Sequence, residues 1–395
     1  MKSTVALISC SSYDPTTVSG AIRRGVDLLG GIEQFVRPGE RLLFKPNILA
    51  GETPSRAVTT HPTVLSECLK LFSEAGGECV FGDSPGLEGS RHAAEGSELM
   101  EAGLGAGARY GDFRSVETRD YALGQFENAF PLARALAECD GVINLPKAKV
   151  HQLTRITGAV KNLYGCIPGK RKAAYHIKYP DVIDFCRLLS ELNLAIKPRL
   201  HIMDAVVAME GNGPRSGDPK QIGALLLSSD PVALDATFAR LIALDPTNVP
   251  TITVGAEMGV GVFEETSVRV VGDDPQAMRD PSFAVTRLPV LANASLAHYD
   301  WLKALTLPKL TIDAKRCTHC GLCVQACPVP GKAISFRNGR RDRPPVYNHK
   351  ACIRCYCCLE MCPNRAIHKR TPLLGQLIES AGQVKLLGNS PVAGD

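Results

Sequence analysis

Eight cysteines near the C-terminal end form two copies of one spacing. The copies read Cys317-x2-Cys320-x2-Cys323-x3-Cys327 and Cys352-x2-Cys355-x2-Cys358-x3-Cys362, and a proline follows each. Thiolates at this spacing ligate [4Fe–4S] cubes, where three cysteines of one run hold one cube and the fourth ligates the other. The pattern therefore predicts two cubes, one on Cys317, Cys320, Cys323 and Cys362, the other on Cys352, Cys355, Cys358 and Cys327.

A zinc ribbon and a disulfide framework are the alternatives for these cysteines. A zinc ribbon needs only four cysteines in two Cys-x2-Cys pairs, so eight cysteines in duplicated register favour clusters over both alternatives. The copies differ at Tyr356-Cys357, which stands where the first copy has Gly321-Leu322. We interpret Cys357 as a small apolar filler, with ligation as the other interpretation.

The length and composition are typical of a soluble globular protein with two or three domains. Of the 395 residues, 45% are hydrophobic and 22% are charged, close to average usage. No apolar run approaches the roughly 20 residues of a membrane helix, and the N-terminal apolar stretch is too short for a secretory signal. The remaining cysteines are scattered, which favours a reducing cytoplasm, and low-potential cubes favour an anaerobic or microaerobic cell. Nothing in the sequence indicates an oligomeric state.

Short apolar strands alternate with helical segments before the cysteine runs. The expected strands are Val5–Cys10, Arg41–Lys45, Cys79–Asp83, Gly141–Leu145, Leu200–Asp204, Ala224–Leu227 and a late edge strand at Ser267–Gly272. The expected helices include Thr17–Gly30, Pro62–Ala75, Leu132–Glu138, Val182–Leu194 and Pro231–Leu244. This alternation is typical of right-handed βαβ units. We predict an α/β fold, a mostly parallel sheet with flanking helices in Rossmann-like layers, followed by a small α+β double-cluster domain.

Three regions follow from this pattern. We place the α/β domain at residues 1–300, the double-cluster domain at residues 308–370 and a C-terminal tail at residues 371–395. The tail holds one short helix candidate, Leu374–Ala381, and then an end expected to fray.

Polar turns follow four of the expected strands. They are Lys45-Pro46-Asn47, Gly82–Gly86, Pro146–His151 and the segment from Asp204 to Pro214. Ligands of such sheets bind beyond the carboxyl ends of the strands. We therefore expect these turns to form a pocket at one edge of the sheet.

From Gly141 to Tyr179 the chain contains no Asp or Glu. The basic residues of this acid-free stretch are Lys147, Lys149, His151, Arg155, Lys161, Lys170, Arg171, Lys172, His176 and Lys178. Such self-repulsion is unfavourable unless something anionic lies there. Two interpretations stay open: a solvated basic face paired with carboxylates from elsewhere, and a site for a phosphate or carboxylate. Nucleic acid is a weaker candidate, because the stretch has three aromatic residues and no recognised module.

Two features inside the stretch suggest chemistry. Gly158 and Ala159 permit close backbone approach where a helix starts, which suits an anion, and Lys161 and Asn162 stand one turn in. Cys166 follows in a Gly-Cys-Ile-Pro-Gly loop. A basic loop would lower the pKa of its thiol for proton donation or nucleophilic attack, and the alternative is a small buried residue.

These motifs resemble the DUF362 family in its ferredoxin-fused form. The resemblance covers roughly residues 1–300, and residues 308–370 are similar to a bacterial-type 2[4Fe–4S] ferredoxin domain. It rests on KPN at Lys45–Asn47, GDSPG at Gly82–Gly86, NLPKAKVH at Asn144–His151, GAVKNLYG at Gly158–Gly165, MDAV at Met203–Val206, EGNGP at Glu210–Pro214 and SSDPVALDA at Ser228–Ala236. The resemblance implies that one site gathers Lys45, Asn47, Asp83, His151, Lys161, Asn162, Asp204 and Asp235. If Asp83, His151, Asp204 and Asp235 converge, they would suit a divalent ion.

Two functions fit these residues best. In the first, an iron–sulfur reductase passes low-potential electrons to an anionic substrate or a cofactor such as a flavin. Its candidate catalytic residues are Lys45, Asp83, His151, Cys166 and Asp204, and its candidate binding residues are Asn47, Lys147, Lys149, Lys161 and Asn162. In the second, a non-catalytic electron carrier or maturation partner docks an acidic redox protein on its basic face. A nucleic-acid enzyme with structural cubes is a third hypothesis.

Overall fold

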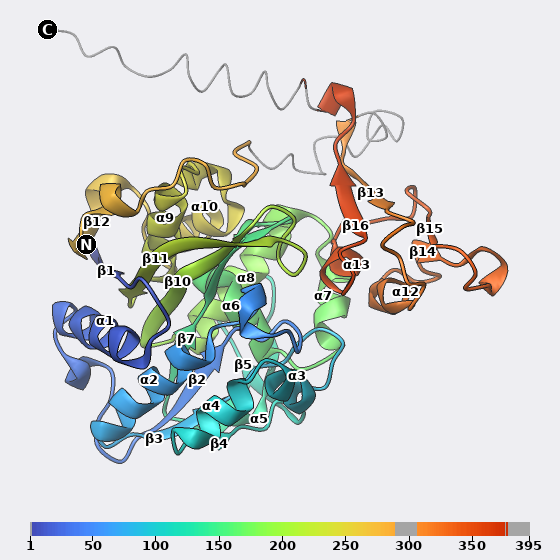
Figure 1. The fold of residues 1–395 in the computed structure, drawn as a ribbon. Coiled ribbons are helices and arrows are strands. Elements are labelled where there is room, and N and C mark those ends of the chain that lie inside the picture. Colours follow the sequence, from blue (N-terminus) through green and yellow to red (C-terminus); the bar gives the residue numbers. More distant parts are fainter. Residues whose placement is uncertain (1, 289–305, 376, 378–395) are drawn as a thin grey trace, which may run out of the picture.

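A ten-stranded sheet organises the α/β part of the molecule (Figure 1). The computed structural model describes residues 2–288, 306–375 and 377. The main path of the sheet runs β12 (Val268–Gly272), β1 (Ser3–Ser9), β11 (Asp218–Ser228), β10 (Leu200–Glu210), β7 (Gly141–Leu145), β2 (Arg41–Pro46), β3 (Glu78–Phe81) and β4 (Arg109–Tyr110). Along this path only β11 runs against the other strands. The predicted α/β class, the mostly parallel sheet and the late edge strand are confirmed.

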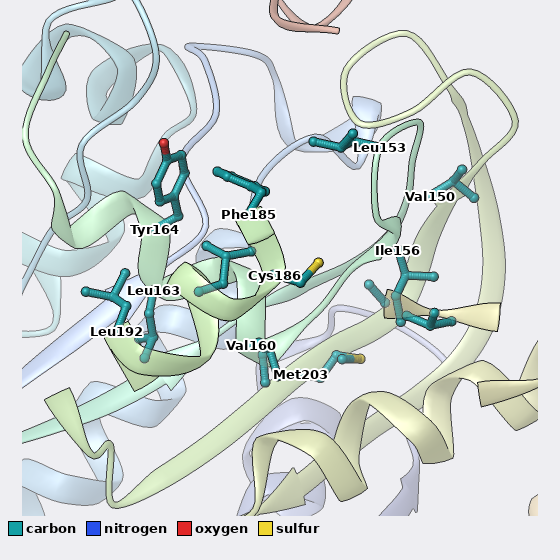
Figure 2. Close-up of a cluster of buried hydrophobic side chains, with 14 of the residues drawn as sticks. Val150, Leu153, Ile156, Val160, Leu163, Tyr164, Phe185, Cys186, Leu192 and Met203 are labelled. Carbon is teal, nitrogen blue, oxygen red and sulfur yellow. The ribbon is translucent and has the colours of Figure 1, made fainter. Parts of the chain in front are cut away.

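Helices cover both faces of the sheet because successive side chains of each strand point to opposite sides. In β1, Ala6 and Ile8 join one core and Val5 and Leu7 join the other. The first core lies under α1 (Pro15–Leu28), α2 (Pro62–Glu74), α3 (Ser90–Gly96) and α4 (Leu99–Gly105). The second lies under α6 (Ala159–Asn162), α8 (Val182–Ile196), α9 (Pro231–Leu241) and α10 (Pro250–Glu257). Figure 2 shows part of this second core, which includes Val160, Phe185 and Leu192.

Three segments differ from the prediction. The polar turn expected from Asp204 starts only after Glu210, because β10 continues to that residue. We predict a polar turn over Pro146–His151, whereas β8 (Lys147–His151) pairs with β10 and with β9 (Arg155–Thr157). Lysines stand in β8 where a buried strand normally has apolar residues, so the sequence pattern does not indicate a strand there. The segment predicted as a helix over Leu132–Glu138 begins inside β6 (Ala129–Ala133), which pairs with β5 (Val116–Asp120), and only α5 (Arg134–Ala137) is helical.

The C-terminal part is a small module with internal pseudo-symmetry, and it lies beside one end of the large sheet (Figure 1). Its strands pair as β13 (Lys309–Ile312) with β16 (Ile367–Arg370) and β14 (Ile334–Ser335) with β15 (Val346–Tyr347). The short helices α12 (Leu322–Ala326) and α13 (Cys357–Glu360) start at matching points of the two copies. Gly321 and Tyr356 precede them with φ of 82° and 63°. The duplicated sequence thus repeats its backbone, including a left-handed residue that is glycine only in the first copy.

Some expected features lie outside the described residues. They are the proposed domain boundary at residue 300 and most of the tail, including the greater part of Leu374–Ala381.

Helix α7 (Arg171–Lys178) lies at the end of the acid-free stretch. Within the described ranges, no helix is both long enough and apolar enough to cross a bilayer.

Candidate functional site

The eight cysteines of the module line two separate small cavities. One is lined by Cys317, Cys320, Cys323 and Cys362, and the other by Cys327, Cys352, Cys355 and Cys358. This is the crossed grouping expected from the spacing, with the fourth cysteine of each run in the other run's set. The backbone N–H groups of Ala333 and Ala366 each donate to a thiol sulfur, Cys327 Sγ and Cys362 Sγ, at 3.3 Å.

These surroundings fit iron–sulfur cubes better than single metal ions. In the described part of the chain, no three His, Cys, Asp or Glu side chains are arranged to bind one ion. A four-iron cube is wider than an ion, so its thiolates stand around a cavity, as the two sets of four cysteines do. The described side chains of Asp83, His151, Asp204 and Asp235 form no such group either.

A larger cavity of about 350 Å³ lies where the module meets the α/β domain. The α/β side of its lining includes Asn47, Asp83, Ser84, Lys161, Asn162, Lys172 and His176, and the module side includes Gln325, Cys327, Pro328, Lys332, Cys357, Glu360 and Met361. Cys327 and Pro328 also line the second cysteine cavity. One cysteine set therefore borders this interdomain cavity directly.

Polar contacts hold the two parts together around the cavity. His151 Nε2 lies 2.9 Å from Glu360 Oε1, although its N–H is not aligned for a hydrogen bond. Asn212 Nδ2 donates to the carbonyl of Ile367 at 3.0 Å, and Arg365 pairs with Asp218 at 2.8 Å. These contacts fix the module against the loops that follow β8 and β10.

A buried polar network supports the α/β wall of the cavity. Lys45 Nζ lies 2.8 Å from Asp83 Oδ1 and donates to Asn162 Oδ1 at 3.1 Å. Asn162 Oδ1 also accepts from Asn47 Nδ2, and Asn47 Oδ1 accepts from Lys149 Nζ at 2.7 Å. Five of the predicted site residues thus form one continuous chain of contacts across β2, the loop after β3, β8 and α6.

The lysines of this wall are held in an unusual environment. Burial lowers the pKa of Lys149 well below its ordinary value, and it also lowers the pKa of Lys161, with help from neighbouring cations. Lys149 donates to Asn47 and to the Val58 carbonyl. Lys161 lines the cavity without a hydrogen bond or ion pair to any described residue. Its ammonium is therefore available to a ligand.

Lys172 and Ser84 form a second polar pair in the lining, and sequence reasoning did not select either as a site residue. Lys172 Nζ lies within 3.0 Å of Ser84 Oγ, the Ser84 carbonyl and the Ile167 carbonyl. Burial lowers the pKa of Lys172 to about 7. Ser84 belongs to the GDSPG motif and Lys172 to the acid-free stretch. Both residues therefore lie in segments whose sequence already suggested a site.

Glu360 was also missed, although it lines the cavity from the module side. It occupies the position of Gln325 in the other copy of the repeat. His151, paired with it, has a pKa lowered to about 4 by burial. Its Nδ1 accepts from the backbone N–H groups of Leu153 and Thr154, so the ring is neutral and carries its proton on Nε2, toward Glu360.

Three predicted residues lie elsewhere. Asp204 forms a buried ion pair with Lys147 at 2.7 Å and accepts from Tyr13 at 2.8 Å, and neither member of the pair lines the interdomain cavity. Cys166 packs in the hydrophobic core, where burial raises the pKa of its thiol to about 12. Lys45 and Lys172 lie close enough to lower this pKa, as expected of a basic environment, but the opposing effect of burial is larger.

Asp235 also serves the fold instead of the cavity. Its carboxylate accepts from the backbone N–H groups of Ala159 and Val160 at the start of α6. The anion expected at this helix start is thus a carboxylate of the protein itself.

The acid-free stretch is largely internal. Lys147, Lys149 and His151 are each at most 2% exposed, and Lys161 and Lys172 face the interdomain cavity. A solvated basic face is therefore wrong for these residues, whereas Lys170, Arg171 and Lys178 are exposed.

Two parts of the chain match known protein families. Residues 42–240 match the family described as "Domain of unknown function (DUF362)", and residues 309–363 match a 4Fe-4S dicluster domain. The thylakoid-associated protein sll1697 of Synechocystis sp. is 37% identical over 262 residues, which cover 66% of this chain and 81% of that protein.

Two solved structures overlap only in part. A Thermotoga maritima protein from the Northeast Structural Genomics Consortium matches with 12% identity and a TM-score of 0.35, over 60% of this chain and 59% of that one. The lactate racemase apoprotein from Thermoanaerobacterium thermosaccharolyticum matches with 14% identity and a TM-score of 0.35, over 62% of this chain and 58% of that one. Overlaps at this level support no functional conclusion. The match over residues 42–240 and the relative from Synechocystis show that this chain belongs to the DUF362 family, and a 4Fe-4S dicluster domain follows its family domain.

Proposed function

We propose that this protein is an iron–sulfur oxidoreductase with two [4Fe–4S] clusters that reduces a small anionic substrate or cofactor in the interdomain cavity. The observation that carries the proposal is the shared position of Cys327, which lines both a cysteine cavity and the interdomain cavity. When bound, the clusters supply single electrons at low potential. The rest of the chemistry falls to the side chains around the cavity.

The charge of the lining supports an anionic ligand. Asp83 is already paired with Lys45, and the lining holds four lysines, Lys161, Lys170, Lys172 and Lys332, against the two carboxylates of Asp83 and Glu360. Lys161 forms no hydrogen bond or ion pair with a described residue, although the Glu360 carboxylate attracts its charge. Lys172 donates to neutral acceptors. The lining therefore has positive charge in excess, which a carboxylate or phosphate group would neutralise.

The size of the cavity supports a small organic molecule. Its volume of about 350 Å³ lies at the lower end of the range for ligand sites, which is about 300–1,000 Å³. Both parts of the molecule contribute to the lining, so a ligand there would contact the family domain and the module together. A bound flavin is one form that such an anion could take.

Reduction of most organic groups also consumes protons, and the lining offers a source. Lys172 has a pKa of about 7, so it can hold or release a proton near neutral pH. Ser84 Oγ lies 3.0 Å from its Nζ and extends the hydrogen-bonded path along the wall. Lys45, Asp83 and His151 would then position this wall and the module, while Asn47, Lys149 and Asn162 hold Lys45 in place.

The first test is anaerobic purification followed by iron and sulfide analysis and mass spectrometry of small molecules released on denaturation. The proposal expects about eight iron atoms per chain, as two cubes require, and an organic anion. Lys161→Met should lose the anion and keep the iron, whereas Lys350→Met, at an exposed lysine of the module, should keep both. Two clusters with an empty cavity, and no effect of Lys161→Met, would favour the non-catalytic electron carrier.

A further inference from the structure

The module carries far more positive charge than the rest of the chain. Between residues 306 and 370 there are thirteen Lys and Arg residues and only three Asp and Glu residues. The formal charge of this segment is therefore +10, against +5 for the whole chain, so the remainder is acidic overall. Such an imbalance acts on partners, because a field of one sign raises encounter rates with molecules of opposite sign.

The charge concentrates in one loop. The arginine loop comprises residues 336–345, which join β14 to β15, and its four arginines are Arg337, Arg340, Arg341 and Arg343. All four are exposed. No carboxylate in the described part of the chain forms an ion pair with any of them. Unlike Lys147 and Lys149 of the acid-free stretch, which are buried, these cations face solvent. Arg341 also lies over the ring of Phe336, with its Cζ 5.6 Å from the ring centroid.

The arginine loop borders the cysteine set that is farther from the interdomain cavity. A Cβ placed on Gly321 would lie 3.4 Å from Arg341 Nη2, so this guanidinium rests against the residue next to Cys320. Pro345, at the end of the loop, lines the cavity of Cys317, Cys320, Cys323 and Cys362. Cys320 itself is exposed. In Figure 1, β14 and β15 lie on the side of the module away from the large sheet.

We infer that the arginine loop is the docking surface for an acidic single-electron carrier protein, which delivers electrons to this outer cysteine set. The partner would lose one electron, and the iron–sulfur centre held by Cys317, Cys320, Cys323 and Cys362 would gain it. The loop lies beside an exposed cysteine ligand. This position favours a redox protein, because electron transfer requires a short distance to the cluster, whereas binding of nucleic acid or an anionic membrane does not. This inference goes beyond the proposed reaction in the cavity.

The test measures binding and electron delivery separately from any reaction in the cavity. The probe is a small acidic ferredoxin, titrated into the cluster-loaded protein by anaerobic calorimetry at 20 mM and 200 mM salt. The variant replaces all four loop arginines with glutamine. A matched variant replaces four exposed arginines of the α/β domain, Arg23, Arg109, Arg269 and Arg279.

We expect the loop variant to bind at least about tenfold more weakly at low salt, since exposed ion pairs each contribute modestly and four are removed. The wild-type affinity should fall steeply with salt, and that dependence should flatten in the variant. Stopped-flow reduction by the ferredoxin, followed by loss of visible absorbance, should slow in parallel. The rate at which the small cation methyl viologen reduces the loop variant should equal the wild-type rate, which would show that the clusters of the variant are intact.

Two results would overturn the inference. One is equal binding by the loop variant and the matched variant. The other is retention on duplex DNA or anionic lipid vesicles that is lost in the loop variant while ferredoxin binding persists. Neither result depends on whether the interdomain cavity binds a substrate, so the inference and the proposed reaction can fail independently.

Discussion

Gly165 is a single position at which one methyl group should disturb the candidate site. A Cβ on Gly165 would lie 1.9 Å from Asp83 Oδ1 and 2.8 Å from Lys45 Nζ. The φ of Gly165 is not in the left-handed region, so any effect of Gly165→Ala comes from this contact and not from backbone strain. The Asp83 carboxylate would have to move by at least about 1 Å, because real Cβ contacts stay beyond about 3.0 Å.

The cost of that movement follows from what Asp83 holds. Its oxygens accept from the backbone N–H groups of Ile48 at 2.7 Å and Ser84 at 2.8 Å, and they pair with Lys45 at 2.8 Å. Overpacking costs about 1–3 kcal/mol, and breaking a buried ion pair costs about 3–5 kcal/mol. Since Asp83 can relax in part, we expect Gly165→Ala to lower the unfolding free energy by about 2–5 kcal/mol.

Urea titration followed by circular dichroism under anaerobic conditions measures this loss. Gly20→Ala is the matched control, because a Cβ at Gly20 meets nothing within 4 Å. It should stabilise α1 by about 0.5–1 kcal/mol. If Gly165→Ala unfolds at the wild-type urea concentration, then Asp83 and Lys45 are not packed against this backbone and the described wall of the cavity is wrong.

Three further changes test separate parts of the structure. Asp204→Asn should cost about 3–5 kcal/mol in urea titration, because it leaves Lys147 buried without the carboxylate 2.7 Å away, and a loss below about 1 kcal/mol would contradict this. Cys327→Ser should lower bound iron from about eight to about four atoms per chain, whereas Cys357→Ser should leave the iron content unchanged, and an equal loss in both would overturn the ligand assignment. The unfolding free energy should rise between pH 7 and pH 10.5, because the pKa of Lys172 is about 7 when folded and 10.5 ordinarily, so the unfolded chain binds the extra proton in this range. Lys172→Met should flatten that rise in urea titrations at several pH values, and an unchanged slope would refute the lowered pKa.

Periodicity was enough to predict the sheet because its strands are apolar on both faces. Leu42, Leu43 and Phe44 in β2 are all fully buried, as expected for a parallel strand covered by helices. The same logic failed for β8, whose Lys147 and Lys149 are buried as deeply as any leucine. Their ammonium groups are satisfied by Asp204 and Asn47, which are distant in sequence. A pattern of local residue types cannot report partners of that kind.

The candidate site was predicted in part for a similar reason. The strand ends correctly brought together Lys45, Asn47 and Asp83 with Lys149 and Asn162. No residue pattern indicates that this wall meets the cysteine module, since that contact depends on how two parts of the chain far apart in sequence pack together. Cys166 shows the converse: cations lie near its thiol as its loop suggests, but burial outweighs them and raises the pKa.

The departures of the second cysteine run from the first mark the side of the module that faces the cavity. Cys357, Glu360 and Met361 replace Leu322, Gln325 and Ala326 of the first copy. Cys357 is half-buried in the cavity lining, and Glu360 contacts His151. Met361 lies close to Gly86, since a Cβ added to Gly86 would be 3.2 Å from Met361 Sδ. In the first copy, Gly321 instead meets Arg341 of the arginine loop. Gln325 and Ala326 of the first copy also line this cavity. An internal repeat needs no such differences to hold two clusters, so we attribute them to the cavity, which the two copies meet with different side chains: an amide and a methyl group from the first, and a carboxylate, a thiol and a thioether from the second.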